Sequence, residues 1–353
     1  MHLSSSRRCG RHGVEQMNGK SWMIAAALIV VPVSAQALGR TMTNGSGDGQ
    51  VSITVTGGGG AGNSAGGAGG FYNPVGPSAT AYTVAQSDLY YRVGGRGPLT
   101  SLTKAFANGE YTTFTLDLTT KEVFSRFYYD GLFIQLRQQL SGIFDMGIQV
   151  GSLLTQEYGF FSQDSITLDL VRYLDVDLVF DGGTEVNDGG GMLTQVDGSA
   201  MLFGIEGDLS PDAATTSVGI YNEGGVANGY QIGNYITLND LVTAGGALSG
   251  SIAGDGSDSD LFIDAGAGHD VALALGARLD VPADIVTRFT TYTFFRSDPL
   301  VAGQGPGGPI GGVPEPTTWA MMIIGFGLTG SVVRRRKPSN EPRMEIGLCQ
   351  TLN

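Results

Sequence analysis

The densest group of potential metal ligands lies between residues 254 and 270, in the sequence GDGSDSDLFIDAGAGHD. Its carboxylates come from Asp255, Asp258, Asp260, Asp264 and Asp270. Calcium prefers several carboxylate and carbonyl oxygens on a loop that can bend, and glycine allows the bend. The sequence therefore indicates a calcium site here, although the same composition also fits a solvated turn between two strands.

The spacing of these acids leaves both interpretations open. It does not match the calcium loop of an EF-hand. The segment AGAGHDVAL, residues 265–273, is partly similar to the Gly-Gly-x-Gly-x-Asp repeat of calcium-binding β-rolls, but at most one and a half copies are present and a roll needs a stack. His269 beside Asp270 could serve as a general base, and a lone histidine in a Gly-rich turn also fits an ordinary exposed residue.

The chain lacks the residues that most other catalytic mechanisms need. The chain has no Gly-x-Ser-x-Gly and no His-Glu-x-x-His, and its two cysteines, Cys9 and Cys349, lie near the two ends. A glycosidase needs only two carboxylates, so a hydrolase of that type stays open. However, no tryptophan lies between Trp22 and Trp319 to offer a sugar-stacking surface.

The net charge of the chain limits the classes of partner that it can bind. The whole chain has a formal charge of -13, and residues 38–313 contain 11 Arg/Lys against 29 Asp/Glu, a net charge of -18. Such a surface repels nucleic acid and anionic headgroups, so we expect no nucleic-acid binding. A solvated, exported protein fits this charge better.

Alternating apolar and polar residues predict many short strands. The pattern is clear in residues 111–119, 165–180, 231–242, 270–281 and 287–295. Clusters of Asp, Gly and Asn at 181–183, 187–191 and 222–225 punctuate it. We predict an all-β fold over residues 82–302, an antiparallel β-sandwich or jelly-roll-like domain with one wet face to each sheet. One helix is expected over residues 131–144, where Leu132, Leu136 and Leu140 recur every four positions.

Two Gly-rich stretches flank this domain. Residues 38–81 include GGGGAGNSAGGAGG at 57–70, and we predict a flexible segment because glycine loses the most entropy on ordering and offers no side chain to pack. Residues 303–312, rich in glycine and proline, are predicted to be a linker to the C-terminal segment.

The amino terminus has the composition of a secretory signal peptide. Lys20 precedes an apolar run from Trp22 to Val33, and Ala35 and Ala37 form a small-x-small cleavage site. We therefore assign residues 1–37 to the signal, with translation expected to start at Met17. A buried helix and a twin-arginine signal at Arg7-Arg8 are the alternatives.

The carboxyl terminus combines a rigid tripeptide, an apolar run and four cations. The run from Trp319 to Val333 would span about 22 Å as a helix, less than the hydrocarbon core of about 30 Å, so tilt or bilayer thinning must compensate. Arg334, Arg335, Arg336 and Lys337 would hold its end in the cytoplasm. Pro314-Glu315-Pro316, before the run, is an extended handle that a protease could grip.

This arrangement resembles the PEP-CTERM sorting signal of Gram-negative bacteria, which is also called the ice-binding-protein C-terminal domain. The matching residues are Pro314, Glu315, Pro316, Trp319, Ala320, Met321, Met322, Gly325, Phe326, Gly327 and the cluster Arg334, Arg335, Arg336. The resemblance covers residues 313–337 and implies that exosortase, a membrane-embedded transpeptidase-like enzyme, cuts near the tripeptide. The family usually ends soon after the arginines, whereas this chain continues with a polar tail, residues 338–353.

Three functions fit these observations. The first is a non-enzymatic surface or extracellular-matrix protein of adhesion or biofilm type, exported by the Sec translocon, cut by signal peptidase, anchored briefly in the inner membrane, then sorted by exosortase. Calcium and an extracellular polysaccharide are its expected ligands. The second is a secreted carboxylate-dependent hydrolase. The third is an ice-binding protein, which needs a repeated Thr-x-Thr ladder that Thr112-Thr113 and Thr290-Thr291 do not supply.

Overall fold

The computed structural model describes residues 39–62, 69–76, 80–95, 97–117, 121–180, 188–195, 198–205, 216–252, 262–263, 270–297 and 300. The signal peptide, the 303–312 linker, the sorting signal and the polar tail lie outside these residues, as do Asp255, Asp258, Asp260, Asp264 and His269. Neither described helix is long and apolar enough to cross a membrane.

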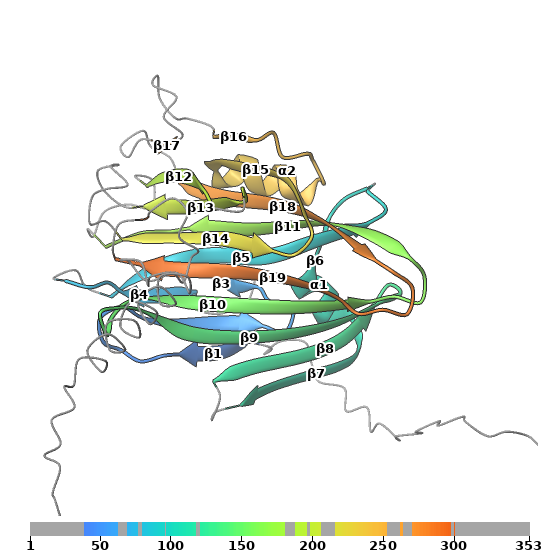
Figure 1. Cartoon of the computed structure of the whole chain (residues 1–353), viewed down its shortest axis with the longest axis horizontal. Helices are drawn as coiled ribbons and strands as arrows, with labels where there is room; N and C mark the ends of the chain where they lie inside the picture. Colours follow the sequence, from blue (N-terminus) through green and yellow to red (C-terminus); the bar gives the residue numbers. More distant parts are fainter. Residues whose placement is uncertain are drawn as a thin grey trace, which may run out of the picture. The chain divides into compact units, whose positions relative to one another are not determined.

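The described chain forms two sheets, shown in Figure 1. Sheet A runs in the order β1 (Gly39–Thr43), β2 (Gln50–Thr56), β3 (Ala61–Gly62), β5 (Ala81–Val93), β11 (Ile166–Val176), β18 (Val271–Val281), β15 (Val226–Asn234) and β16 (Ser251–Ile252). Two further strands join it: β4 (Gly70–Asn73) pairs with β2 and β5, and β6 (Thr100–Ser101) pairs with β5. Only the short β15–β16 pair is parallel among the described pairs.

Sheet B contains the longest hairpin in the described part of the chain, formed by β9 and β10. Its order is β17 (Phe262–Ile263), β12 (Gly189–Thr194), β13 (Ala200–Ile205), β14 (Ser217–Glu223), β19 (Thr287–Arg296), β10 (Ile148–Phe161), β9 (Leu132–Asp145), β8 (Glu122–Tyr129) and β7 (Glu110–Asp117). All of its described pairs are antiparallel. The all-β prediction is therefore confirmed for the described chain, as two sheets with two short helices.

The sheets share one hydrophobic interior, which makes the fold a sandwich. Val55 and Leu174 of sheet A lie in the same buried cluster as Leu140 and Val218 of sheet B. A second cluster joins Leu89 and Leu168 to Leu136 and Phe289 in the same way. Alternate residues of each strand point inward, so burial of one apolar face from each sheet holds the two layers together.

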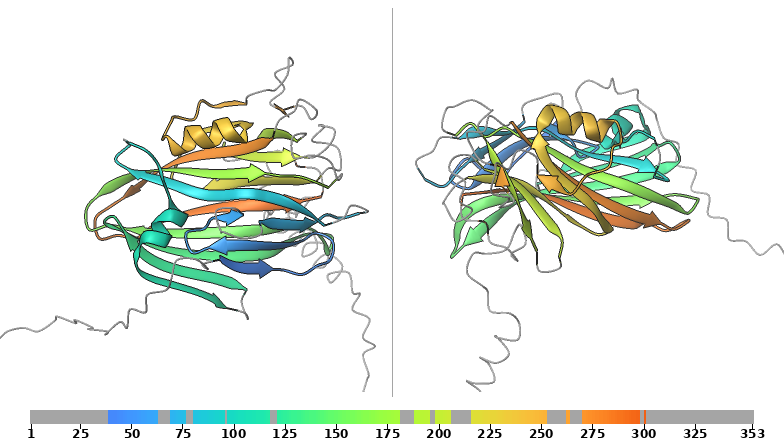
Figure 2. Two further views of the ribbon diagram at one scale, coloured as in Figure 1. Left: turned by 180° about the vertical axis from the view of Figure 1, so that it is seen from behind. Right: turned by 90° about the horizontal axis from the view of Figure 1, so that it is seen from above.

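Helix α2 (Tyr235–Thr243) covers the outer face of sheet A, as Figures 1 and 2 show. Leu238 and Val242, one turn apart, pack onto Val171 and Tyr173 of β11. Strand β11 is consequently buried on both faces, and the prediction of one wet face for every sheet is wrong there.

The expected strand over residues 231–242 is corrected by the same element, since the chain leaves β15 at Asn234 and turns into α2. The Asn234 side-chain oxygen accepts a hydrogen bond from the Ile236 amide at 3.1 Å and caps the helix. A strand over 231–242 would direct Leu238 and Val242 to one side but would not place them over β11.

The expected helix over residues 131–144 is also wrong, because this segment is strand β9. A spacing of four is a multiple of the strand period of two as well as close to one helical turn. Leu132, Leu136 and Leu140 point inward together with Ile134 and Gln138, which lie at the intervening even positions. The burial of every second residue, including Ile134 and Gln138, is the pattern of a strand.

The Gly-rich segment is not a flexible linker where the structure describes it. Residues 39–62 and 69–76 contain strands β1 to β4, and residues 57–60, which we call the glycine turn, are buried between the sheets. A side chain on Gly58 would collide with the backbone at Leu102 and Thr103, at the start of helix α1 (Leu102–Asn108). Glycine is therefore required here because helix backbone approaches the turn too closely for a Cβ atom.

Polar side chains of sheet B satisfy the carbonyls of the glycine turn. Gln156 donates to Gly59 O at 2.7 Å and Tyr158 donates to Gly58 O at 3.4 Å. Ser125 donates to Gly57 O, and Gln138 donates to Thr56 O at 2.8 Å. The buried turn thus keeps its hydrogen bonds without water, which is the condition for placing irregular backbone inside a core.

Candidate functional site

A cluster of three carboxylates lies on the outer side of sheet A. It joins Asp175, at the end of β11, Asp177, two residues later, and Asp270, directly before β18. One carboxylate oxygen from each lies within 4.8 Å of the others. Asp175 pairs with Ala272 across the two strands, so the antiparallel register of β11 and β18 brings these acids together.

The cluster has little contact with water. Asp175 and Asp177 are each 7% exposed, and the Oδ1 atoms of Asp175 and Asp270 are shielded from solvent. Burial and the neighbouring Asp175 and Asp270 carboxylates raise the pKa of Tyr173 above its usual range. Burial is the main cause of this shift, and the two carboxylates add to it by opposing a further negative charge at this end of β11.

Carboxylates this close repel one another unless a proton or a cation offsets their charge. Asp175, Asp177 and Asp270 are therefore the described residues that could contribute oxygens to calcium. Of the five acids predicted from the sequence, Asp270 alone is described, and the structure joins it to Asp175 and Asp177, which lie in the segment 165–180 that was predicted to be a strand. Calcium binding itself stays a prediction.

A different buried carboxyl belongs to β5 of sheet A, where Asp88 is the cross-strand partner of Tyr173. Asp88 of β5 is 2% exposed, accepts a hydrogen bond from Ser101 and lies beside Arg172, which donates to the Asp88 carbonyl at 3.0 Å. Burial raises the pKa of Asp88 to about 6, against the opposing effects of Ser101, Thr103 and Arg172. Asp88 lines neither of the two cavities described below.

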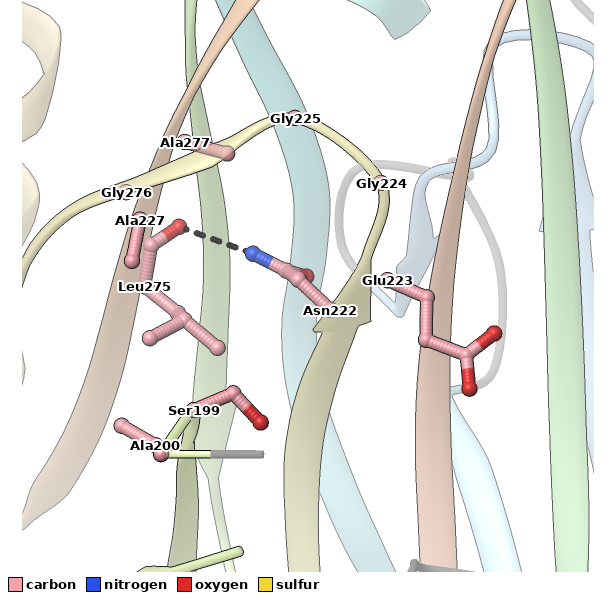
Figure 3. Close-up of a pocket in the computed structure, with 11 residues that line it drawn as sticks. Ser199, Ala200, Asn222, Glu223, Gly224, Gly225, Ala227, Leu275, Gly276 and Ala277 are labelled. Carbon is pink, nitrogen blue, oxygen red and sulfur yellow. Dashed lines mark hydrogen bonds between the residues drawn. The ribbon is translucent and has the colours of Figure 1, made fainter. Parts of the chain in front are cut away.

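The first of two described cavities, of about 300 Å³, lies beside the β14–β15 turn and is drawn in Figure 3. Its lining is dominated by glycine and alanine. Asn222 donates to Leu275 O at 3.4 Å across it, whereas Glu223 points the other way and accepts from Tyr292 at 2.8 Å. Among the described residues that line this cavity, Glu223 is the only carboxylate.

The second cavity, of about 580 Å³, opens on the outer face of sheet B. Tyr128, Phe133 and Phe161 contribute aromatic rings to its wall, and Asp164 is the only carboxylate of its lining. A carboxylate-dependent glycosidase needs two carboxyl groups on one substrate site. Neither of the described cavities has such a pair.

The C-terminal segment carries the deciding match. A model of the PEP-CTERM protein-sorting motif matches residues 312–337. The chain carries a PEP-CTERM sorting motif. The resemblance noted for Pro314, Glu315, Pro316, Trp319 and the arginine cluster is confirmed by this match. The PEP-CTERM motif implies export, transient sorting at the membrane of a Gram-negative bacterium, and exosortase as the processing partner.

Comparison of the rest of the PEP-CTERM chain with known proteins gives no functional assignment. No curated protein sequence matches it. Among solved structures, a candidate kojibiose phosphorylase from the human microbiome is similar with a TM-score of 0.39 and 12% sequence identity. The match covers 84% of this chain but 34% of the phosphorylase, so the chain spans about a third of that protein's length. Similarity of this size carries no argument about activity.

Proposed function

We propose that the mature protein is a non-catalytic structural protein of the cell surface or extracellular matrix, of adhesion or biofilm type. The observation that carries this proposal is the PEP-CTERM match at residues 312–337, which directs the chain out of the cytoplasm and to exosortase. At the amino terminus, the Sec translocon exports the chain and signal peptidase cuts it after Ala35-Gln36-Ala37. The folded part that remains would then act at or outside the envelope.

The sandwich supports a structural role over an enzymatic one. Each described cavity has a single carboxylate, and the buried Asp88 lines neither of them. The acidic surface, with a net charge of -18 over residues 38–313, keeps an exported chain soluble and suits contact with uncharged polymers.

Ice binding receives no support from the threonines of β19. Thr291 points into the core and is 0% exposed. Thr290 lies on the outer face, between its cross-strand partners Glu157 and Glu223. A ladder of threonines on one flat face therefore does not form at this position.

The first experiment follows processing in a host that has exosortase and in the same host without it. We expect the surface fraction of the first to contain a chain with the intact mass of a product that starts at Leu38 and ends near Pro314. The host without exosortase, and a Glu315→Ala variant in the first host, should retain the uncut chain in the membrane. A mature chain that still contains residues 334–353 in the first host would refute exosortase sorting.

The structural role is tested separately, by deleting the gene and measuring surface-attached biomass. We expect biomass to fall and to recover when the wild-type chain is supplied, but not when the Glu315→Ala variant is supplied. Normal biomass in the deletion strain, with normal processing of the wild-type chain, would reject a structural role and leave the sorting assignment intact.

A further inference from the structure

The 580 Å³ cavity lies where the chain crosses twice between the sheets. Strand β10 continues into β11 through residues 162–165, and β18 continues into β19 through residues 282–286. The two crossings are tied together, since Asp284 N–H donates to Ser162 O at 2.9 Å and Ala283 N–H donates to Ser165 Oγ at 3.1 Å. The wall that they form is thus held in place by hydrogen bonds rather than left as two independent loops.

Three aromatic residues form a row across neighbouring strands of this cavity. Tyr128 of β8 is the cross-strand partner of Phe133 of β9, and Phe133 is the partner of Phe161 of β10. Their chain neighbours Phe127 and Phe160 are buried inside the sandwich, so the row itself projects from the outer face of sheet B. With strands about 4.8 Å apart, the row extends over about 10 Å.

Polar groups border the row without being used by the fold. The side-chain amides of Gln135 and Gln163 and the carboxylate of Asp164 line the cavity, and none of the three makes a hydrogen bond to another described residue. Asp164 is nevertheless fixed through its backbone, because its N–H donates to Ser162 Oγ at 3.2 Å. Donors and acceptors therefore stand beside the aromatic row with hydrogen-bonding capacity that the described fold does not use.

We propose that this aromatic row is a binding site for a neutral polysaccharide, with successive sugar rings lying on Tyr128, Phe133 and Phe161. Rings present flat apolar surface to the C–H faces of a pyranose, and amides and a carboxylate satisfy its hydroxyl groups. Small-molecule sites combine apolar walls with a few placed polar groups in this way. An extended row fits a polymer better than a single sugar.

The negative charge of the protein favours an uncharged polysaccharide over an acidic one. Asp164 is the only charged side chain that lines the cavity, and residues 38–313 have a net charge of -18. A polyuronate would meet repulsion both at the site and on approach. This inference rests on the proposed surface role, since it supplies the partner that such a protein would hold.

The test uses the protein recovered from the surface fraction of its host and that host's extracellular polysaccharide, separated into neutral and acidic fractions. Affinity gel electrophoresis gives an apparent Kd for each fraction. We expect the neutral fraction to retard the protein and the acidic fraction to have little effect. Tyr128→Ala and Gln163→Ala should each weaken binding of the neutral fraction at least about tenfold.

Phe144→Ala is the matched control, because Phe144 is another exposed aromatic residue of β9, at the far end of that strand. It should leave binding unchanged, and melting of each variant confirms folding. Tyr128 is 39% exposed and Gln163 is exposed, so both substitutions should be tolerated.

Three results would overturn the proposal: no retardation by the neutral fraction, equal retardation by the acidic fraction, or full binding by both Tyr128→Ala and Gln163→Ala. A chain that reaches the surface but binds no polysaccharide overturns only this inference. A chain that stays uncut in the membrane overturns the sorting assignment, while detergent-solubilised protein still tests the aromatic row.

Discussion

Substitution of Gly58 by alanine tests the burial of the glycine turn. This turn was predicted from its glycine content to be flexible, yet it is buried between the sheets. A Cβ atom there would lie 2.5 Å from Thr103 N and closer still to the Leu102 carbonyl. Both neighbours belong to the backbone of the first turn of α1, so neither can rotate away as a flexible side chain could. Either the turn or the helix must move.

We expect Gly58→Ala to lower the free energy of unfolding by about 3 kcal/mol, the upper part of the usual range for overpacking a core. For a folded region of this size, that loss corresponds to a fall in Tm of about 6 to 12 °C. Urea unfolding and thermal melting of the full chain, followed by circular dichroism, measure both quantities.

Gly47→Ala is the matched control for this substitution. Gly47 is exposed, its φ is not positive, and an added Cβ would be in ordinary contact with Gln50 at 3.5 Å. We expect a change within about 0.5 kcal/mol. If Gly58→Ala is as stable as Gly47→Ala, the glycine turn is not held between the sheets and the reasoning is wrong.

Three further predictions concern a buried acid, a helix cap and a metal. Because burial raises the pKa of Asp88 to about 6, the folded chain binds this proton more tightly than the unfolded chain, so the free energy of unfolding falls as pH rises from about 4 to about 6. Asp88→Asn should remove about 3 kcal/mol of that fall between pH 4 and pH 7 in urea unfolding, and an unchanged pH dependence would contradict the assignment. Asn234→Ala removes the cap of α2 and should cost about 1 kcal/mol by the same assay, whereas Asn234→Ser should restore most of it; equal losses would show that the cap is not used. The calcium prediction for the acidic segment requires Tm to rise when calcium replaces a chelator and Asp270→Asn to reduce that rise; identical melting curves with and without calcium would reject it.

Much of the strand pattern was readable from the sequence. The alternating segments 111–119, 165–180, 270–281 and 287–295 correspond to β7, β11, β18 and β19. Alternation is a local property, since every second residue of a strand meets the core wherever that strand lies in the sheet. The turn between β14 and β15 was readable from the asparagine and glycines at residues 222–225, which are typical of turns.

Errors arose where a local pattern fits two structures. Leucine at every fourth position is compatible with a helix and a strand, and β9 is decided by pairing with β8 and β10. Asn234 to Val242 alternates loosely, yet it becomes α2 because the outer face of β11 and β18 offers apolar surface that a helix can cover. These outcomes depend on distant residues that no local window contains.

The sites show the same division. The sorting motif is a linear signal that a partner enzyme recognises along the chain, so its residues could be identified from the sequence by themselves. The sequence also determined the all-β class, the acidic charge and the absence of cysteine between the two ends. Only the tertiary structure brought Asp270 to Asp175 and Asp177, placed three aromatic residues side by side, and buried the glycine turn. Each of those arrangements depends on strand register and on the packing of one sheet against the other, which join residues that are far apart along the chain.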